Sequence, residues 1–320
     1  MTRLTGHDEA WSAWHEAMGS ARMHHAWILA GIKGVGKGAF ARAAAAQLVA
    51  EPGLVQPAWA AHPDIVVLDH LPANDAEDEK RAEGKPWQKK RNITIDQVRR
   101  MQARLVTRPT LGARRAVIID PADDMEKGAV NALLKSLEEP PAGTYFLLVA
   151  HRPGRLLPTI RSRCRVLRFA PLSPPQIEQV LLAEAPQTDA ATRAAAITAA
   201  EGSPGAALAF VDQDLGALHA IMRRLIGEGD DHLALRAALA EAIGTRPDRE
   251  RLQAAIDLAR AVVAAELPLG DPARQARVID AHGELTRLAG QAATYNYDPG
   301  LLVMEIGGLL ASLAMPRETA

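Results

Sequence analysis

The first half of the chain alternates short apolar runs with longer segments that have helical spacing. The apolar runs are Ala26–Ala30, Asp64–Leu68, Ala116–Asp120, Tyr145–Ala150 and Arg165–Phe169. Helical patterns lie between them, over Ala39–Ala50, Ile95–Leu105 and Ala129–Leu137. Apolar strands separated by helices are typical of a parallel sheet covered on both faces. The pattern therefore predicts an α/β domain over residues 1–170.

The second half shows no convincing strand pattern. Ser173 followed by Pro174 and Pro175 predicts an N-cap with proline in the first turn of a helix over Gln176–Ala183. The remaining sequence is rich in alanine, which favours closely packed helices. We expect a small helical lid domain over residues 171–212 and an all-α collar domain over residues 213–320.

A charged segment, residues 71–93, interrupts the α/β pattern. It has few aliphatic residues and contains two prolines, at positions 72 and 86. These features predict an exposed, mobile loop. Its cluster Lys89–Lys90–Arg91 is a candidate contact for nucleic acid, although a solvated loop is the favoured interpretation.

The formal net charge of −1 argues at first against a nucleic-acid partner. The charge is uneven, however. Residues 1–170 carry 25 Lys and Arg against 18 Asp and Glu, a balance of +7, and residues 171–320 carry 12 Arg against 20 acids, a balance of −8. The asymmetry suggests domains with different partners, while the alternative is that it only affects solubility. Charge alone leaves both interpretations open.

Two absences narrow the class of protein. No apolar run approaches the roughly 18 residues needed to span a bilayer, so no membrane partner is expected. A single cysteine excludes a disulfide framework and a cysteine-based zinc site, and it fits a reducing compartment. We therefore expect a cytoplasmic protein without zinc.

A glycine-rich segment follows the first predicted strand and opens a helix, which is the setting of a phosphate-binding loop. Glycines let backbone N–H groups surround phosphate oxygens, and the helix N-terminus adds partial positive charge. Lys37 would reach the β- and γ-phosphates of ATP or ADP. The predicted nucleotide-binding residues are Gly31, Gly34, Gly36, Lys37, Gly38 and Asp120.

The same site lacks groups that hydrolysis requires. Gly38 stands where Ser or Thr would bind Mg²⁺ through a hydroxyl. Asp120 could hold the metal, but Pro121 stands where ATPases of this kind have a glutamate that positions water. Three alternatives remain open. The loop serves only the fold, it holds nucleotide without turnover, or Asp123 or Asp124 replaces the glutamate in an active ATPase.

An ordered series of motifs resembles the clamp-loader branch of the AAA+ ATPases. The resemblance covers residues 4–210. The motifs that carry it are Arg22–Leu29, His62-Pro-Asp64, Ile95–Arg99, Asn131–Pro141 (NALLKSLEEPP) and Leu157–Cys164 (LPTIRSRC).

The resemblance implies a non-hydrolysing subunit of a five-membered ring that places a sliding clamp on primer–template DNA. The implied partners are the gamma/tau and delta subunits of bacterial DNA polymerase III, of which gamma/tau hydrolyse ATP. Ser162-Arg163-Cys164 matches the family's arginine-finger motif, in which Arg163 enters the neighbouring subunit's ATP site. A guanidinium supplied in trans stabilises the transferring phosphoryl group.

Some family features are missing or weak. Gly202-Ser-Pro-Gly205 is followed by Ala206, where the family usually has an arginine that contacts phosphate. Residues 51–61 stand where many relatives carry a four-cysteine zinc module. Arg99 and Arg100 are candidate DNA contacts, with ordinary surface charge as the alternative.

Overall fold

The computed structural model describes residues 4–20, 22–244, 247, 249–267, 271–292 and 298–314. The chain divides into two compact units, Met1–Pro171 and Leu172–Ala320.

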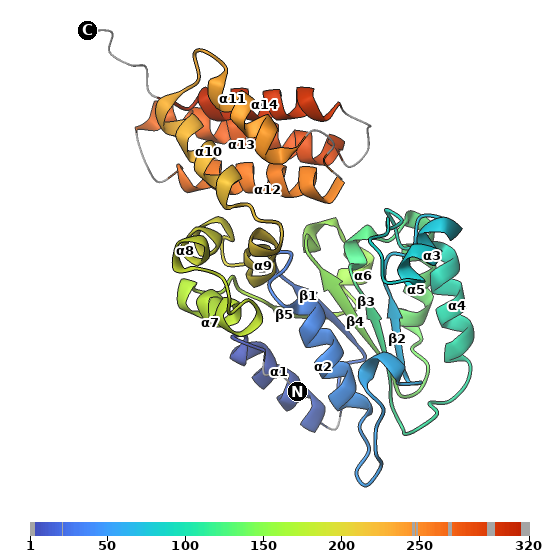
Figure 1. The fold of residues 1–320 in the computed structure, drawn as a ribbon. Helices are drawn as coiled ribbons and strands as arrows, with labels where there is room; N and C mark the ends of the chain where they lie inside the picture. The colour runs from blue at the N-terminus through green and yellow to red at the C-terminus, as the bar shows by residue number, and fades with distance from the viewer. Residues whose placement is uncertain are drawn as a thin grey trace. The chain divides into compact units, whose positions relative to one another are not determined.

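The first unit is built on a five-stranded parallel sheet with the order β2-β3-β4-β1-β5 (Figure 1). Each of the five predicted apolar runs forms a strand, which confirms the predicted parallel α/β class. The central pairing places Trp27 of β1 beside Leu147 of β4. The strands are β1 (Ala26–Ala30), β2 (Ile65–Leu68), β3 (Arg115–Ile119), β4 (Thr144–Ala150) and β5 (Arg165–Arg168).

Each face of the sheet packs against its own group of helices (Figure 1). In β1, Trp27 and Leu29 join the core with α1 and α2, whereas Ile28 joins the core with α4, α5 and α6. This alternation follows from the two-residue period of a strand. The helices are α1 (Asp8–Gly19), α2 (Lys37–Val49), α3 (Asp75–Ala82), α4 (Ile95–Leu105), α5 (Lys127–Glu138) and α6 (Pro158–Arg161), with short 3₁₀ turns η1 (Trp59–Ala61), η2 (Ala122–Asp124) and η3 (Pro153–Arg155).

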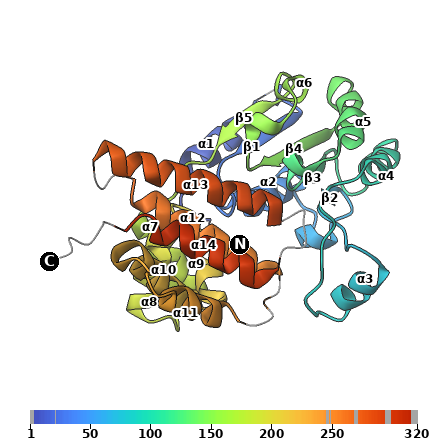
Figure 2. The same cartoon turned by 90° about the horizontal axis from the view of Figure 1, so that it is seen from above.

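The prediction of an exposed loop over residues 71–93 is wrong for Asp75–Ala82, which form α3, although most of the segment is exposed as predicted. The side chain of Asn74 accepts a hydrogen bond from the N–H of Glu77 and so caps the helix. Gly84, at φ 71°, ends it in the left-handed conformation. Figure 2 shows α3 projecting beside the sheet. The charged composition concealed ordinary helix start and stop signals.

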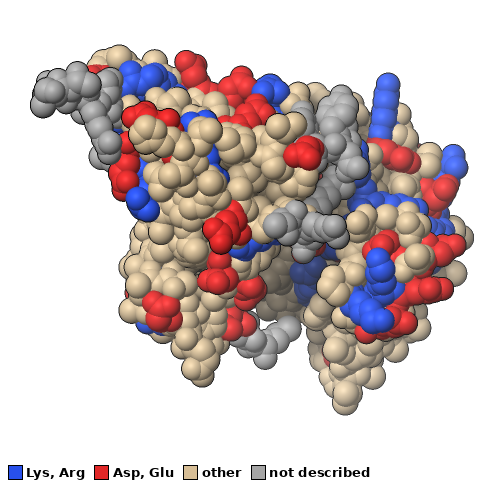
Figure 3. Space-filling view, turned by 45° about the horizontal axis from the view of Figure 1, so that its top comes forward, with Lys and Arg blue, Asp and Glu red and all other residues tan. Residues whose placement is uncertain are grey.

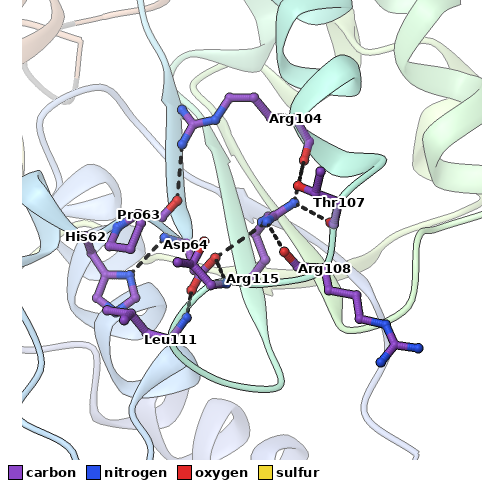
Figure 4. A network of polar contacts seen from close by, with 9 residues as sticks. His62, Pro63, Asp64, Arg104, Thr107, Arg108, Leu111 and Arg115 are labelled. Atoms are coloured by element: carbon purple, nitrogen blue, oxygen red, sulfur yellow. Dashed lines mark hydrogen bonds and ion pairs between the residues drawn. The ribbon is translucent and has the colours of Figure 1, made fainter.

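A buried ion pair holds the chain that leaves α4 (Figure 4). Asp64, before β2, accepts hydrogen bonds from the N–H groups of Thr110 and Leu111, and its Oδ1 lies 3.5 Å from Arg115 Nη2. Both side chains are buried. Arg115 also donates to the carbonyls of three residues at the helix exit, namely Arg104, Thr107 and Arg108. The His62-Pro-Asp64 motif therefore fixes this connection.

The second unit is helical in the part of residues 172–314 that the structure describes, as the sequence predicted. The N–H of Ser173 donates to Gln176 Oε1, which confirms the predicted start of α7. One hydrophobic cluster runs from Leu172 to Leu313, and a division into lid and collar at residue 212 stays a prediction. The helices are α7 (Pro174–Glu184), α8 (Ala190–Ala199), α9 (Pro204–Asp212), α10 (Gly216–Glu228), α11 (Ala234–Ile243), α12 (Arg249–Ala265), α13 (Pro272–Ala292) and α14 (Pro299–Ala311).

Candidate functional site

The phosphate loop lies where the sequence predicts, between the end of β1 and the start of α2. Gly34 and Gly36 have φ values of 78° and 108°, which favour glycine. A Cβ on Gly31 would lie 2.5 Å from the carbonyl oxygen of Phe169. Gly31 is therefore required by the close approach of the chain after β5, whether or not a ligand binds.

Lys37 turns back onto the loop that precedes it. Its side chain is buried, and its Nζ donates to the carbonyl oxygens of Gly31 at 2.7 Å and Ile32 at 2.5 Å. Burial lowers the pKa of Lys37 to about 8, while the charges of Asp120 and Asp123 oppose that shift. Lys37 and Asp120 therefore lie close enough to interact electrostatically.

Gly38 faces an ion pair. Arg42 Nη2 lies 3.6 Å from Asp120 Oδ2, and a Cβ on Gly38 would lie 2.6 Å from that same oxygen. Burial raises the pKa of Asp120, and the charge of Arg42 works in the opposite direction. The carboxylate that the sequence offered as a metal ligand is thus paired with a guanidinium.

The two carboxylates that follow Pro121 already have partners. Asp123 accepts hydrogen bonds from the N–H groups of His151 and Arg152, at the end of β4. Asp124 Oδ2 lies 3.3 Å from His70 Nε2. Both carboxylates therefore support local structure in this conformation.

His70, just after β2, connects two acidic residues. Its Nδ1 lies 3.4 Å from Asp69 Oδ1, and its Nε2 contacts Asp124. The hydrogen bond to Asp124, followed by the one to Asp69, raises the pKa of His70 to about 9. The imidazolium therefore joins the carboxyl ends of β2 and β3.

His151 directly follows β4, near the phosphate loop. Burial, followed by the charge of Lys37, lowers its pKa to about 4, so the ring is neutral near pH 7. Its buried Nδ1 has no hydrogen-bond partner among the residues that the structure describes. A neutral imidazole there can donate to or accept from a ligand.

Arg163 lies in the connection between α6 and β5, far along the chain from the phosphate loop. Its Nη2 is 2.7 Å from Glu138 Oε1 at the end of α5, and its Nη1 donates to Thr159 O at 2.9 Å. Ser162 Oγ also donates to Thr159 O. Cys164 packs partly buried against the sheet core, and burial raises the pKa of its thiol to about 12. Cys164 is therefore a packing residue with an unreactive thiol, whereas the side chain of Arg163 reaches the surface.

Arg99 and Arg100 lie on the exposed side of α4. Arg99 Nη1 is 3.7 Å from Asp96 Oδ1, and Arg100 donates to the carbonyl of Asp96. On the face drawn in Figure 3, Lys and Arg side chains lie among Asp and Glu side chains. DNA contact by these two arginines stays a prediction.

Four residues of the site were not found by sequence reasoning, namely Arg42, His70, His151 and Glu138. Arg42 carried a usable signal, because it follows Gly38 by four positions on one helix and so shares its face. His151 directly follows β4 and His70 lies two residues after β2, at the edge of a parallel sheet where ligands bind in such folds. Glu138 belongs to a quoted motif, but its pairing with Arg163 depends on the tertiary fold.

The sheet order, the loop and the helices define a P-loop module of the AAA+ class followed by a helical unit. The fold is that of a gamma subunit-related protein of DNA polymerase III from Thermotoga maritima, with a TM-score of 0.53, 18% identity, and coverage of 95% of this chain and 99% of that chain.

The family is shown by its sequence model. The model described as "DNA polymerase III, delta subunit" matches residues 6–173, more than half of the 320 residues. The chain belongs to this family. Its motifs resemble the delta-prime subunits of the clamp-loader branch, and the relatives confirm that resemblance.

Curated relatives carry the name DNA polymerase III subunit delta'. The one from Pseudomonas aeruginosa is 38% identical over 166 residues, covering 47% of this chain and 44% of that protein. The one from Escherichia coli is 40% identical over 129 residues, covering 40% and 38%. The tau subunit of Salmonella typhimurium is 28% identical over 317 residues, covering 98% of this chain and 43% of that protein. The alignments thus span less than half of each of these relatives.

Two further observations concern ions and membranes. Within the described ranges, no group of three or more His, Cys, Asp or Glu side chains is placed to hold a metal ion. No helix in the described part of the chain is both long and apolar enough to cross a membrane.

Proposed function

We propose that this chain is a delta-prime-type subunit of a DNA polymerase III clamp loader. In this role it does not hydrolyse ATP itself. It supplies Arg163 to the ATP site of a neighbouring gamma/tau subunit, and the ring also contains a delta subunit. The assembled complex acts on a sliding clamp and primer–template DNA, which places the chain in the cytoplasm at the nucleoid.

One contrast carries the proposal. The chain's own loop has Gly38 beside the Arg42–Asp120 pair and Pro121 in place of a glutamate, whereas Arg163 is intact and its side chain, 36% exposed, reaches the surface. Such a chain lacks groups to hydrolyse ATP itself but keeps an arginine at the surface. It is therefore suited to supplying that arginine to the ATP site of a neighbouring subunit.

The second candidate is an active ATPase in which Asp123 or Asp124 orients water. The contacts favour the first candidate, because Asp123 accepts two backbone N–H groups and Asp124 pairs with His70. A general base must reach the water that it activates with a free oxygen. These contacts already engage both oxygens of Asp123 and Oδ2 of Asp124.

We also propose the domain roles that the resemblance implies: a nucleotide-binding-like domain over 1–170, a lid over 171–212 and a collar over 213–320. Large apolar side chains are exposed on the helices assigned to the collar, namely Ile279 on α13 and Leu301 on α14. Contiguous exposed apolar patches mark interfaces between subunits, and we propose that these two side chains belong to such contacts.

Co-purification with gamma/tau and delta subunits tests the assembly. Truncation after residue 212 would remove much of the hydrophobic cluster that surrounds the buried Phe210, so point variants are cleaner. Leu301→Asp, at a side chain 72% exposed, is expected to weaken assembly. Leu182→Asp on α7, 49% exposed, is the matched control. Equal recovery of both variants with the ring would contradict a collar role for α14.

A further inference from the structure

The side chains of Asp120 and Arg42 crowd the position beside Gly38, where a metal-binding hydroxyl would stand. A Cβ added to Gly38 would lie 2.6 Å from Asp120 Oδ2 and 3.1 Å from Arg42 Nη1. A serine or threonine at position 38 would therefore have to push both side chains away. In this conformation the surroundings of Gly38 leave no room for a side chain that carries a hydroxyl.

Arg42 is held in this position from two sides. Its guanidinium lies 3.6 Å from Asp120, and its Cζ lies 5.2 Å from the centre of the Trp59 ring, a cation–π contact. Trp59 belongs to η1, in the segment after α2. Arg42 thus presents a fixed positive charge one helical turn beyond Gly38.

The donor set does not fit Mg²⁺. This ion requires oxygen ligands in a near-octahedral arrangement, and Gly38 offers none while Asp120 is shared with Arg42. Arginine stays protonated at any pH the protein tolerates, so it cannot withdraw its charge when a cation approaches. A metal ion would have to displace a guanidinium from a partly buried carboxylate.

The groups that bind phosphate are nevertheless present. Gly34 and Gly36 keep the left-handed loop geometry, Lys37 directs its ammonium into the loop, and the buried Nδ1 of His151 lacks a protein partner within the described residues. Burial lowers the pKa of Lys37 to about 8, and phosphate oxygens beside it would favour the charged ammonium.

We propose that this loop binds the phosphates of a nucleoside di- or triphosphate without a divalent metal ion. The guanidinium of Arg42 supplies the positive charge that a metal ion would otherwise provide. The proposal rests on the proposed function in one respect, namely that the site does not hydrolyse its ligand. The loop would then act as a metal-independent nucleotide site that stabilises the first unit. Nucleotides and free pyrophosphate share a polyphosphate group, so pyrophosphate is the alternative ligand that the experiment must distinguish from a nucleotide.

Calorimetric titration of the full chain without ring partners tests this directly. ADP, ATP and pyrophosphate are each titrated in EDTA and in excess Mg²⁺. We expect nucleotide binding in EDTA that is at least as tight as in Mg²⁺. Binding of pyrophosphate but of neither nucleotide would identify a simple anion site and overturn the proposed nucleotide ligand. Binding that requires Mg²⁺, or no binding of any of the three at millimolar concentration, overturns the proposal.

Variants identify the cation. Arg42→Gln should weaken nucleotide binding in EDTA by about tenfold, the loss expected for one charge-assisted contact, whereas Arg42→Lys should retain most of it. Gly38→Ser combined with Arg42→Ala should make the remaining binding depend on Mg²⁺. Arg224→Ala, in the second unit, is the control, and thermal unfolding shows whether each variant folds. An unchanged affinity in folded Arg42→Gln would overturn the role of Arg42. Because no partner is present, these results are separate from ring assembly.

Discussion

Arg163 Nη2 lies 2.7 Å from Glu138 Oε1, so the arginine that matches the finger motif is ion-paired within its own chain. Its Nη1 donates to the carbonyl of Thr159. Both terminal nitrogens therefore have partners within the chain, and a guanidinium that extends into a neighbouring subunit would leave these contacts. The end of α5 thus controls how readily Arg163 can reach out.

Weakening that pair should change the rate of the assembled complex. Glu138→Gln keeps the shape and removes the charge that competes with phosphate for Arg163. Exposed ion pairs contribute about 0.2–1 kcal/mol, so we expect ATP turnover by the ring to rise by up to about fivefold. Steady-state turnover measures it, with Glu139→Gln, the next residue, as the control. A fall in turnover would instead mean that Glu138 positions Arg163.

Loss of the buried carboxylate before β2 should destabilise the first unit. Asp64→Asn leaves Arg115 buried without its counter-ion, a change that costs about 3–5 kcal/mol in comparable buried pairs. Chemical denaturation measures the free energy of unfolding. Asp78→Asn on α3, whose partner Arg81 is exposed, should change it far less. Equal effects would mean that the Asp64–Arg115 pair contributes no more than a surface pair.

The same carboxylate gives an acid-side pH dependence. Burial raises the pKa of Asp64, but the N–H groups of Leu111 and Thr110 and the charge of Arg115 outweigh it and lower the pKa below 3.8. The stabilisation is therefore complete above pH 3.8 and is lost as pH falls through the lowered folded-state pKa. Asp64→Asn should lose less stability over that acid range than the unmodified chain.

His70 should give the opposite dependence at alkaline pH. Its pKa rises from 6.5 to about 9 because Asp124 and Asp69 bind the imidazolium. Its contribution is complete below pH 6.5 and is lost as pH rises through about 9. His70→Asn should flatten the fall in unfolding free energy across this range. An unchanged pH profile in that variant would contradict the charged state of His70.

The isolated chain should show negligible ATP turnover. Gly38 and Pro121 supply neither a metal ligand nor a base, and Asp123 and Asp124 have other partners. Turnover of a purified sample measures it, with Lys37→Ala as the control, since a contaminating ATPase would not respond to that change. Steady turnover that Lys37→Ala abolishes would establish the active-ATPase alternative.

Much of the fold was predictable because apolar runs report burial directly. Ile28, Ile118 and Leu147 each lie in runs too apolar for an exposed strand, and all are fully buried. The order of the strands was not predictable, since it depends on which strands pair across the chain. The helix α3 was missed because its acidic first turn and basic last turn looked like loop charge, although they suit the helix dipole.

The candidate site was predictable only along the chain. Gly31 through Gly38 and Asp120 form recognisable motifs, so their positions followed from the sequence. Arg42 and Glu138 matter because of what they contact, at Asp120 and Arg163, and such pairs across the fold leave no local pattern. The structure also gives a second reason for glycine at position 38. The side chains of Arg42 and Asp120 meet there, and a Cβ would lie against both.

The most direct test of the account counts the ATP hydrolysed in the first turnover of a reconstituted complex with gamma/tau and delta subunits, sliding clamp and primed DNA. With Arg163→Ala in this chain, assembly should be unchanged and the burst should contain about one ATP fewer per complex, because one arginine serves one neighbouring site. Arg161→Ala, at an exposed neighbour, should retain the full burst. A full burst with Arg163→Ala would contradict the central claim.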